Sequence, residues 1–126
     1  MNLDLEKVAL RAVACKHWRW MHGMQLIHPP VHSGATGYIT RLAVHDYSSL
    51  LGEYPDLTDP ATIGCLVDLV RRAWEPRLGK AVVPSPVCAA EGWGVGAQFS
   101  SEGFSYIVLP NHSSEVEALV FALEKV

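Results

Sequence analysis

The sequence predicts an α+β fold, with one mostly antiparallel sheet of about four to five strands and three helices packed on one of its faces. The first observation behind this prediction is the order of patterns along the chain, which runs helix, two strands, helix, two strands, helix. The second is that three separate apolar helix faces need a common surface, which a sheet supplies. The third is the length of 126 residues, which fits a single domain over residues 1–126.

The first half of the chain predicts one helix and one hairpin. The helix runs from Asp4 to about Lys16, where apolar residues recur three and four positions apart. The apolar run 24–27 and the stretch 38–44, which is rich in β-branched and aromatic residues, have strand character. The segment 32–37 between them is dominated by Ser, Gly and Thr and reads as a loop. We therefore expect the two strands to pair.

The second helix has the clearest signals. Asp59 suits the N-cap, because its carboxylate can accept unpaired backbone N–H groups, and Pro60 suits the first helical position. One apolar stripe follows at helical spacing, made of Ile63, Leu66, Val67, Val70 and Trp74. We expect Pro76 to end the helix, because a proline inside a helix removes a hydrogen bond and clashes with the preceding turn. A loop with a short strand at 81–83 should follow.

The last third of the chain predicts a second hairpin and a third helix. Apolar and small residues alternate over 93–99, and strand character resumes over 104–109 after the turn 100–103. Ser114 and Glu117 have the spacing of a capping box, which indicates a helix start. Apolar residues then repeat on one face up to the end of the chain.

The charge balance argues against direct nucleic-acid binding. The chain carries 10 Lys and Arg against 13 Asp and Glu, so its formal net charge is −3. Phosphate contacts normally require a basic face. The cluster of Lys16, His17 and Arg19 and the pair of Arg71 and Arg72 are too small to reverse this expectation.

Composition also bounds the compartment and the assembly. No apolar run approaches the roughly 20 residues that span a bilayer, and the start of the chain lacks a signal-peptide pattern, so we expect a cytoplasmic protein without membrane contact. The three cysteines are widely spaced and should be reduced thiols. Only 18% of residues are charged, which favours an exposed apolar patch and hence a protein partner or a homo-oligomer.

No motif assigns a catalytic residue, a cofactor or a metal ligand. The glycine-rich stretch 92–96 lacks the strand-to-helix context of a phosphate loop, and the histidines and cysteines lack metal-site spacing. Turn chemistry explains Asp56, and capping explains Asp59. A small enzyme acting on a nucleotide-like ligand remains an alternative. It requires at least two of His112, Cys88 and this Asp pair to meet in one cleft.

The second hairpin supplies the candidate contact surface. Trp93, Val95, Ala97 and Phe99 form one row, which should be core, while the opposite row is nearly bare of side chains. A bare row lets another backbone or a planar ligand approach closely, with tryptophans at its margin. The partner-binding candidates are Trp18, Trp20, Gly94, Gly96 and Gln98. The anion-binding candidates are Arg71 and Arg72.

Two segments carry a resemblance to known proteins. Residues 57–74, with the sequence LTDPATIGCLVDLVRRAW, and the ending 115–124, EVEALVFALE, are similar to a group of small phage and prophage proteins of unknown function. The opening 3–8 and the stretch 18–24 are similar to the same group. The stretch 79–106 departs from it, so the second hairpin takes no meaning from the resemblance.

The resemblance implies an origin rather than a chemistry. Small phage accessory proteins often bind and block a host factor, so it implies a non-enzymatic accessory protein in the host cytoplasm. Its partner would be a host protein or a small signalling ligand, and an inhibitor of a bacterial defence system, such as an anti-CRISPR protein, is one form of this function. The alternative is an oligomeric sponge for a small anionic signal, with Arg71 or Arg72 at the anion site.

Overall fold

The computed structural model describes residues 3–28, 40–43, 53–79, 82–98 and 104–126. Within these residues the elements follow in the order α1 (Leu3–Ala14), β1 (Gln25–His28), β2 (Thr40–Ala43), β3 (Tyr54–Pro55), α2 (Pro60–Leu78), β4 (Ser85–Ala89), β5 (Gly92–Gln98), β6 (Phe104–His112) and α3 (Glu115–Lys125).

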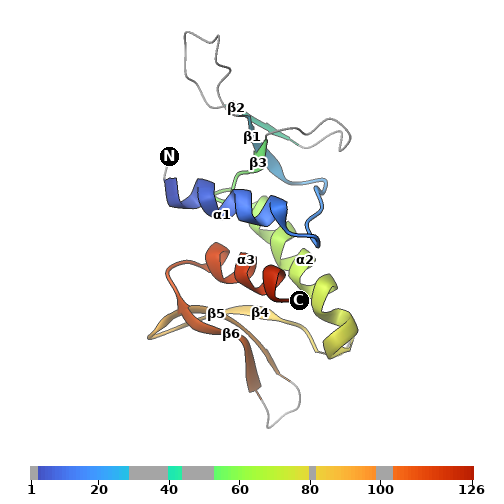
Figure 1. Ribbon diagram of the computed structural model, residues 1–126, viewed down its shortest axis with the longest axis vertical. Coiled ribbons are helices and arrows are strands. Elements are labelled where there is room, and N and C mark those ends of the chain that lie inside the picture. The colour runs from blue at the N-terminus through green and yellow to red at the C-terminus, as the bar shows by residue number, and fades with distance from the viewer. Residues whose placement is uncertain (1–2, 29–39, 44–52, 80–81, 99–103) are drawn as a thin grey trace.

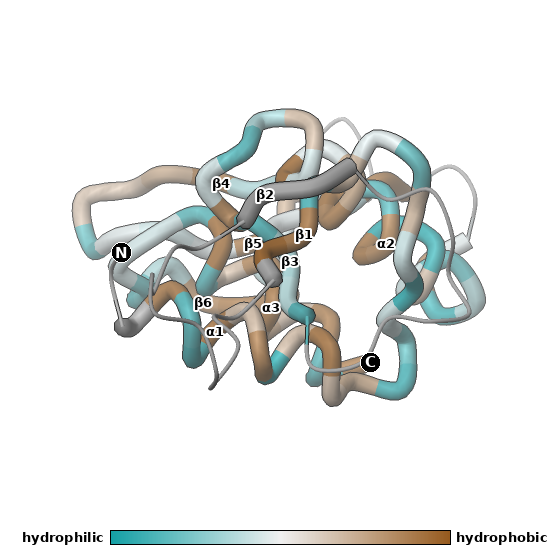
Figure 2. The backbone as a smooth tube through the Cα atoms, turned by 90° about the horizontal axis from the view of Figure 1, so that it is seen from above, coloured by the Kyte–Doolittle hydropathy of each residue, from teal (hydrophilic) through white to brown (hydrophobic). Residues whose placement is uncertain are grey.

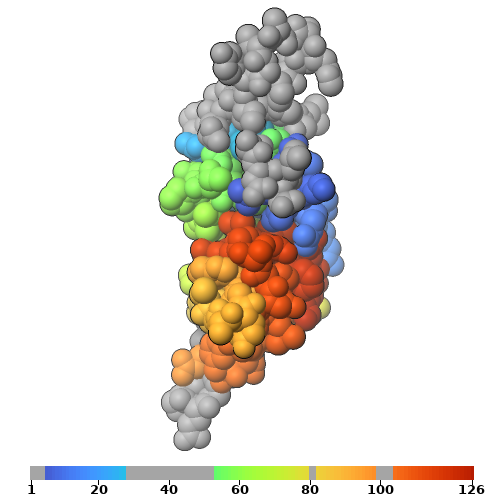
Figure 3. Space-filling model, turned by 90° about the vertical axis from the view of Figure 1, so that its left-hand side faces the viewer, coloured from blue at the N-terminus to red at the C-terminus, as the bar shows by residue number. Residues whose placement is uncertain are grey.

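The helices form a middle layer between two small sheets (Figure 1). The first sheet has the strand order β2-β1-β3 and the second the order β4-β5-β6, with every pairing antiparallel. Helix α3 lies against the second sheet and also packs on α1 and α2, whereas α1 contacts β3. The space-filling view places the second sheet at one end of the molecule, beyond α3 (Figure 3). The described residues are therefore stacked along one long axis.

The predicted α+β class is confirmed, with antiparallel strands and three helices that contact strands in the described residues. The expectation of one sheet under all three helices is wrong, since the strands divide between two sheets. The physical reason is that the helices pack largely on one another. Each sheet consequently has to cover only one side of the helical layer.

Helix α2 begins as predicted but ends later. The Asp59 carboxylate accepts the Thr62 N–H at 2.9 Å as the N-cap, and Pro60 is the first helical residue. Pro76 lies inside the helix instead of ending it, because it sits in the last turn, where one lost hydrogen bond costs little cooperativity. The helix ends at Gly79, whose N–H donates to the Glu75 carbonyl and whose φ of +84° favours glycine.

The strands differ from expectation between α2 and β5. Residues 82–84 are not in a strand, residues 80–81 lie outside the described residues, and β4 starts at Ser85. Pro86 is tolerated inside β4 because β4 is an edge strand of its sheet. The two-residue strand β3 was also not predicted. Both hairpins, β1 with β2 and β5 with β6, pair as predicted.

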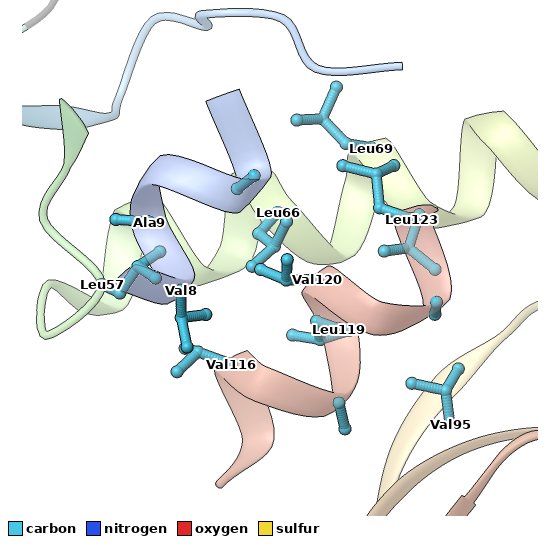
Figure 4. Close-up of a cluster of buried hydrophobic side chains, with 14 of the residues drawn as sticks. Val8, Ala9, Leu57, Leu66, Leu69, Val95, Val116, Leu119, Val120 and Leu123 are labelled. Atoms are coloured by element: carbon cyan, nitrogen blue, oxygen red, sulfur yellow. The ribbon is translucent and has the colours of Figure 1, made fainter. Parts of the chain in front are cut away.

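Helix α3 is the centre of the core. Its apolar side chains Val116, Leu119, Val120 and Leu123 meet residues of α1 and α2 such as Val8 and Leu66 (Figure 4). Ala118 and Ala122 are wholly buried as well, so α3 is covered on more than the one predicted face. In Figure 2, the hydrophobic residues along α3 and β1 can be followed by their brown colour. Among the described residues, no helix combines the length and the hydropathy needed to cross a membrane.

Polar links connect the ends of the helices across this core. The Trp74 indole Nε1 donates to the Ala122 carbonyl at 2.9 Å, in a buried contact between α2 and α3. The Cys15 thiol donates to the Leu123 carbonyl at 3.3 Å, and the Arg11 guanidinium pairs with the Glu124 carboxylate. The first and the last helix are thus joined by two side-chain contacts at their C-terminal ends.

Candidate functional site

A cavity of about 300 Å³ lies between the segment that follows α1 and the middle of α2. The segment contributes Lys16, His17, Arg19, Trp20 and Met21. Helix α2 contributes Leu69, Arg72 and Ala73. We call this site the basic cavity. It brings together two residues that the sequence had placed in different hypotheses, namely Trp20 as a partner contact and Arg72 as an anion contact.

The electrostatics of the basic cavity are one-sided. Among the described residues, Lys16, Arg19 and Arg72 line it and no carboxylate does, although the chain as a whole is acidic. Arg72 pairs through Nε with Asp68 at 2.8 Å. Its terminal nitrogens have no partner among the described residues and remain available as donors. A local excess of positive charge in an acidic protein attracts anions to this place.

The aromatic residues of the segment form one wall. Trp18 and Trp20 meet edge to face, with ring centroids 5.4 Å apart. Both rings pack against the core, and Trp20 also lines the cavity. Within the described chain, Nε2 of His17 and Nε1 of Trp18 are buried without a hydrogen-bond partner. Such unpaired buried nitrogens are uncommon in folded proteins, so two polar groups of this segment lack the hydrogen bonds that buried groups normally have.

Arg71 has a different role from Arg72. Its Nε donates to the Pro84 carbonyl at 3.1 Å, and one terminal nitrogen lies 3.5 Å from the Ser85 hydroxyl. The side chain therefore fixes the start of β4 against α2. Of the two predicted anion-binding arginines, only Arg72 lines the basic cavity. Both line a second hollow of about 420 Å³, but there the carboxylates of Asp68 and Glu75 accompany them.

The expected bare row of the second hairpin is covered by the chain itself. A Cβ at Gly94 would lie 2.5 Å from the Val108 carbonyl oxygen, and a Cβ at Gly96 would lie 2.2 Å from the ring of Phe104. Both glycines are buried. The expectation that they present an open surface is wrong, because the neighbouring strand supplies both the close backbone and the planar ring. Gln98 is exposed, as expected, and Phe99 lies outside the described residues.

The outer face of the second sheet instead presents aromatic side chains. Val95 points into the core, so its neighbour Gly96 and the residue paired with Gly96, Tyr106, point to the opposite face. Phe104 pairs with Gln98 and shares that face. The rings of Phe104 and Tyr106 meet edge to face, 5.2 Å apart, and are 52% and 42% exposed. We call this outer side of β6 the aromatic face.

The residues of the enzymatic alternative do not converge. Cys88 and His112 both pair with Trp93, from opposite sides, so two strand spacings of roughly 10 Å in total separate them. The Asp pair lies at the first sheet, where Asp56 accepts from Thr58 and Asp59 from Thr62. In the part of the chain that the structure describes, no group of three or more His, Cys, Asp and Glu is arranged to hold a metal ion.

His112 takes part in a polar cluster at the start of α3. The Ser113 hydroxyl donates to Glu117 at 2.6 Å, and His112 Nδ1 lies 3.6 Å from the same carboxylate. The hydrogen bond from Ser113 is the largest cause that lowers the pKa of Glu117, and His112 adds to it against the effect of burial. The Ser114 hydroxyl accepts the Glu117 N–H at 3.2 Å, as the capping box predicts. This cluster is a helix cap.

Sequence reasoning missed several of these residues. The basic cluster of Lys16, His17 and Arg19 was visible, but its proximity to α2 depends on tertiary packing. The exposure of Phe104 and Tyr106 had a local signal, since they alternate with Ser105 and Ile107 in a predicted strand. Only the position of Val95 in the core, together with the strand pairing, shows that Phe104 and Tyr106 lie on the opposite face of the sheet.

Comparison of the chain with protein-family profiles, curated protein sequences and solved structures gives no match. The resemblance to small phage and prophage proteins therefore stays a prediction, and the case for function rests on the two surfaces described above.

Proposed function

We propose that this chain is a non-enzymatic binding protein that docks another protein on the aromatic face of its second sheet. The observation that carries the proposal is the pair of exposed rings at Phe104 and Tyr106. Leu109, further along β6, is 65% exposed. Aromatic residues are enriched in the buried centres of protein interfaces, where a few of them supply most of the binding energy.

The partner is expected to meet the face of the sheet rather than its edge. Both edge strands of the second sheet contain a proline, Pro86 in β4 and Pro110 in β6. A proline interrupts the row of backbone donors that an added strand would need. The helices cover the inner face, so the outer face is the one that a partner can approach.

The resemblance to small phage and prophage proteins suggests the kind of partner, which is part of this proposal. A phage accessory protein meets the proteins of its bacterial host, and defence systems are the host factors whose inhibition benefits a phage. We therefore expect the partner to be a host protein, such as a component of a defence system.

A photo-crosslinking residue at position 106 tests the proposal. Leu10 in α1 is 47% exposed and supplies the matched control position, away from β6. We expect one host protein to crosslink at position 106 and not at position 10. With that protein purified, Y106S should weaken binding by roughly thirtyfold, as for a central aromatic contact, and L10S should not.

Two results would count against the proposal. One is equal crosslinking at positions 106 and 10. The other is a dimer of the purified chain in sedimentation that Y106S dissociates, because the aromatic face would then be occupied by a second copy instead of a host protein. Tyr106 is preferred to Phe104 for these tests, since Phe104 also covers Gly96.

A further inference from the structure

We propose that the basic cavity is a binding site for a phosphorylated ligand with a flat aromatic part, of the size of a nucleoside monophosphate. This site lies on α2 and the segment after α1 and uses no residue of the aromatic face. The inference therefore does not depend on the proposed docking of a protein.

The charged side of the cavity matches a phosphate group. Lys16 and Arg19 have no ion-pair partner among the described residues, and Arg72 engages Asp68 through Nε alone. Guanidinium groups bind phosphate oxygens through pairs of parallel N–H donors, and lysine adds a compact positive charge. Three cations from two separate elements thus line one hollow, and among the described residues the one carboxylate that pairs with them, Asp68 on Arg72, does not line it.

The other walls match a flat apolar group. Trp20 and Met21 come from the segment, and Leu69 and Ala73 come from α2. A bare phosphate ion needs no such wall, whereas an aromatic base gains contact area against tryptophan and aliphatic side chains. The volume of about 300 Å³ lies at the lower end of small-molecule sites, which suits one nucleotide.

Titration calorimetry on the purified chain tests the site, with AMP and GMP as probes. We expect both to bind, adenosine to bind far more weakly because it lacks the phosphate, and inorganic phosphate to bind more weakly because it lacks the base. R19Q and R72Q should each reduce the affinity for AMP roughly tenfold or more, as the loss of a charge-assisted hydrogen bond does. K7Q removes an exposed cation of α1 outside the cavity and should leave the affinity unchanged.

Clear outcomes would overturn the inference. Absence of heat with AMP and GMP at millimolar concentration would do so, as would equal affinities in R19Q, R72Q and K7Q. Tighter binding of a single-stranded oligonucleotide than of AMP would identify the cavity as part of a nucleic-acid surface and would also overturn it. K16Q provides a second charge-removing variant should R72Q unfold, with the melting temperature measured for each variant.

Discussion

At the level of single residues, Gly94 and Gly96 of β5 are required for different reasons. The close neighbours of Gly94 are backbone atoms of residues 108–110, which cannot move without breaking the pairing of β5 with β6. The close neighbour of Gly96 is the ring of Phe104, which can rotate away from the sheet. Gly94 also lies where the register between β5 and β6 shifts, between Trp93 and Val95.

We therefore expect G94A to destabilise the protein more than G96A. Forcing a methyl group into backbone should cost about 1–3 kcal/mol or more, as overpacking does elsewhere, whereas G96A should cost less because Phe104 can yield. Denaturant unfolding of both variants measures the difference. A larger loss in G96A than in G94A would contradict the close approach of β6.

The pH dependence of stability should reflect Glu117. Because the folded state lowers the pKa of this carboxyl, its stabilising contribution is present above the unfolded pKa and is lost as pH falls through the folded value. We expect E117Q to be less stable than the parent at pH 7 and to approach it in stability near pH 3. The exposed Glu91, outside this cluster, supplies the control E91Q for the loss of one negative charge. The same pH dependence of stability in E117Q and E91Q would contradict the role given to Glu117.

At the level of elements, one hydroxyl joins the start of α2 to β1. The Thr62 side chain donates to the Asp59 carboxylate at 2.8 Å and accepts the Gln25 N–H at the same distance. Thr62 is wholly buried, and both bonds are partly shielded from water. The cap of α2 and the first sheet thus share one polar atom.

Removing this atom should loosen both elements. We expect T62V to cost about 1–3 kcal/mol, because it removes the acceptor of the partly buried Gln25 N–H. T62S keeps the hydroxyl and should cost less. Equal destabilisation by the two variants, measured by thermal unfolding, would mean that the methyl group rather than the hydrogen bonds matters here.

Local signals in the sequence predicted which helices and strands form better than they predicted where these elements end. Asp59 and Ser114 begin helices as expected, because capping depends on hydrogen bonds within four residues. The prediction that Pro76 ends α2 was wrong, since the destabilisation of a helix by proline depends on how near the proline lies to the end of the helix. The strand β4 was hidden by Pro86, which only an edge position tolerates, and edge positions are a property of the whole sheet.

At the scale of the whole molecule, the core is continuous from the first sheet to the second. Leu119 of α3 is almost wholly buried between α1, α2 and the second sheet (Figure 4). The division into two sheets could not be predicted, because apolar patterns show which faces are buried but not which element covers them. For the same reason the sequence did not reveal that Lys16 and Arg72 share a cavity.

A change at Leu119 should therefore be felt at both ends of the molecule. We expect L119A to cost about 2–5 kcal/mol and to reduce hydrogen-exchange protection in β1 and β5 together. L10A, at an exposed position of α1, should change neither. Loss of protection confined to β5 would indicate that the two sheets unfold independently.

The contact between α1 and α3 has a consequence for the order in which the chain folds. Arg11 and Glu124, which pair across it, are 113 positions apart in sequence. Each hairpin pairs two strands that follow one another along the chain. The contact between Arg11 and Glu124, in contrast, must close a loop of nearly the whole chain, and contacts of high sequence separation slow folding. During synthesis the residues of α1 must wait for α3 before their shared interface can form, and until then the apolar side chains of Val8, Ala9 and Ala12 stay accessible to chaperones.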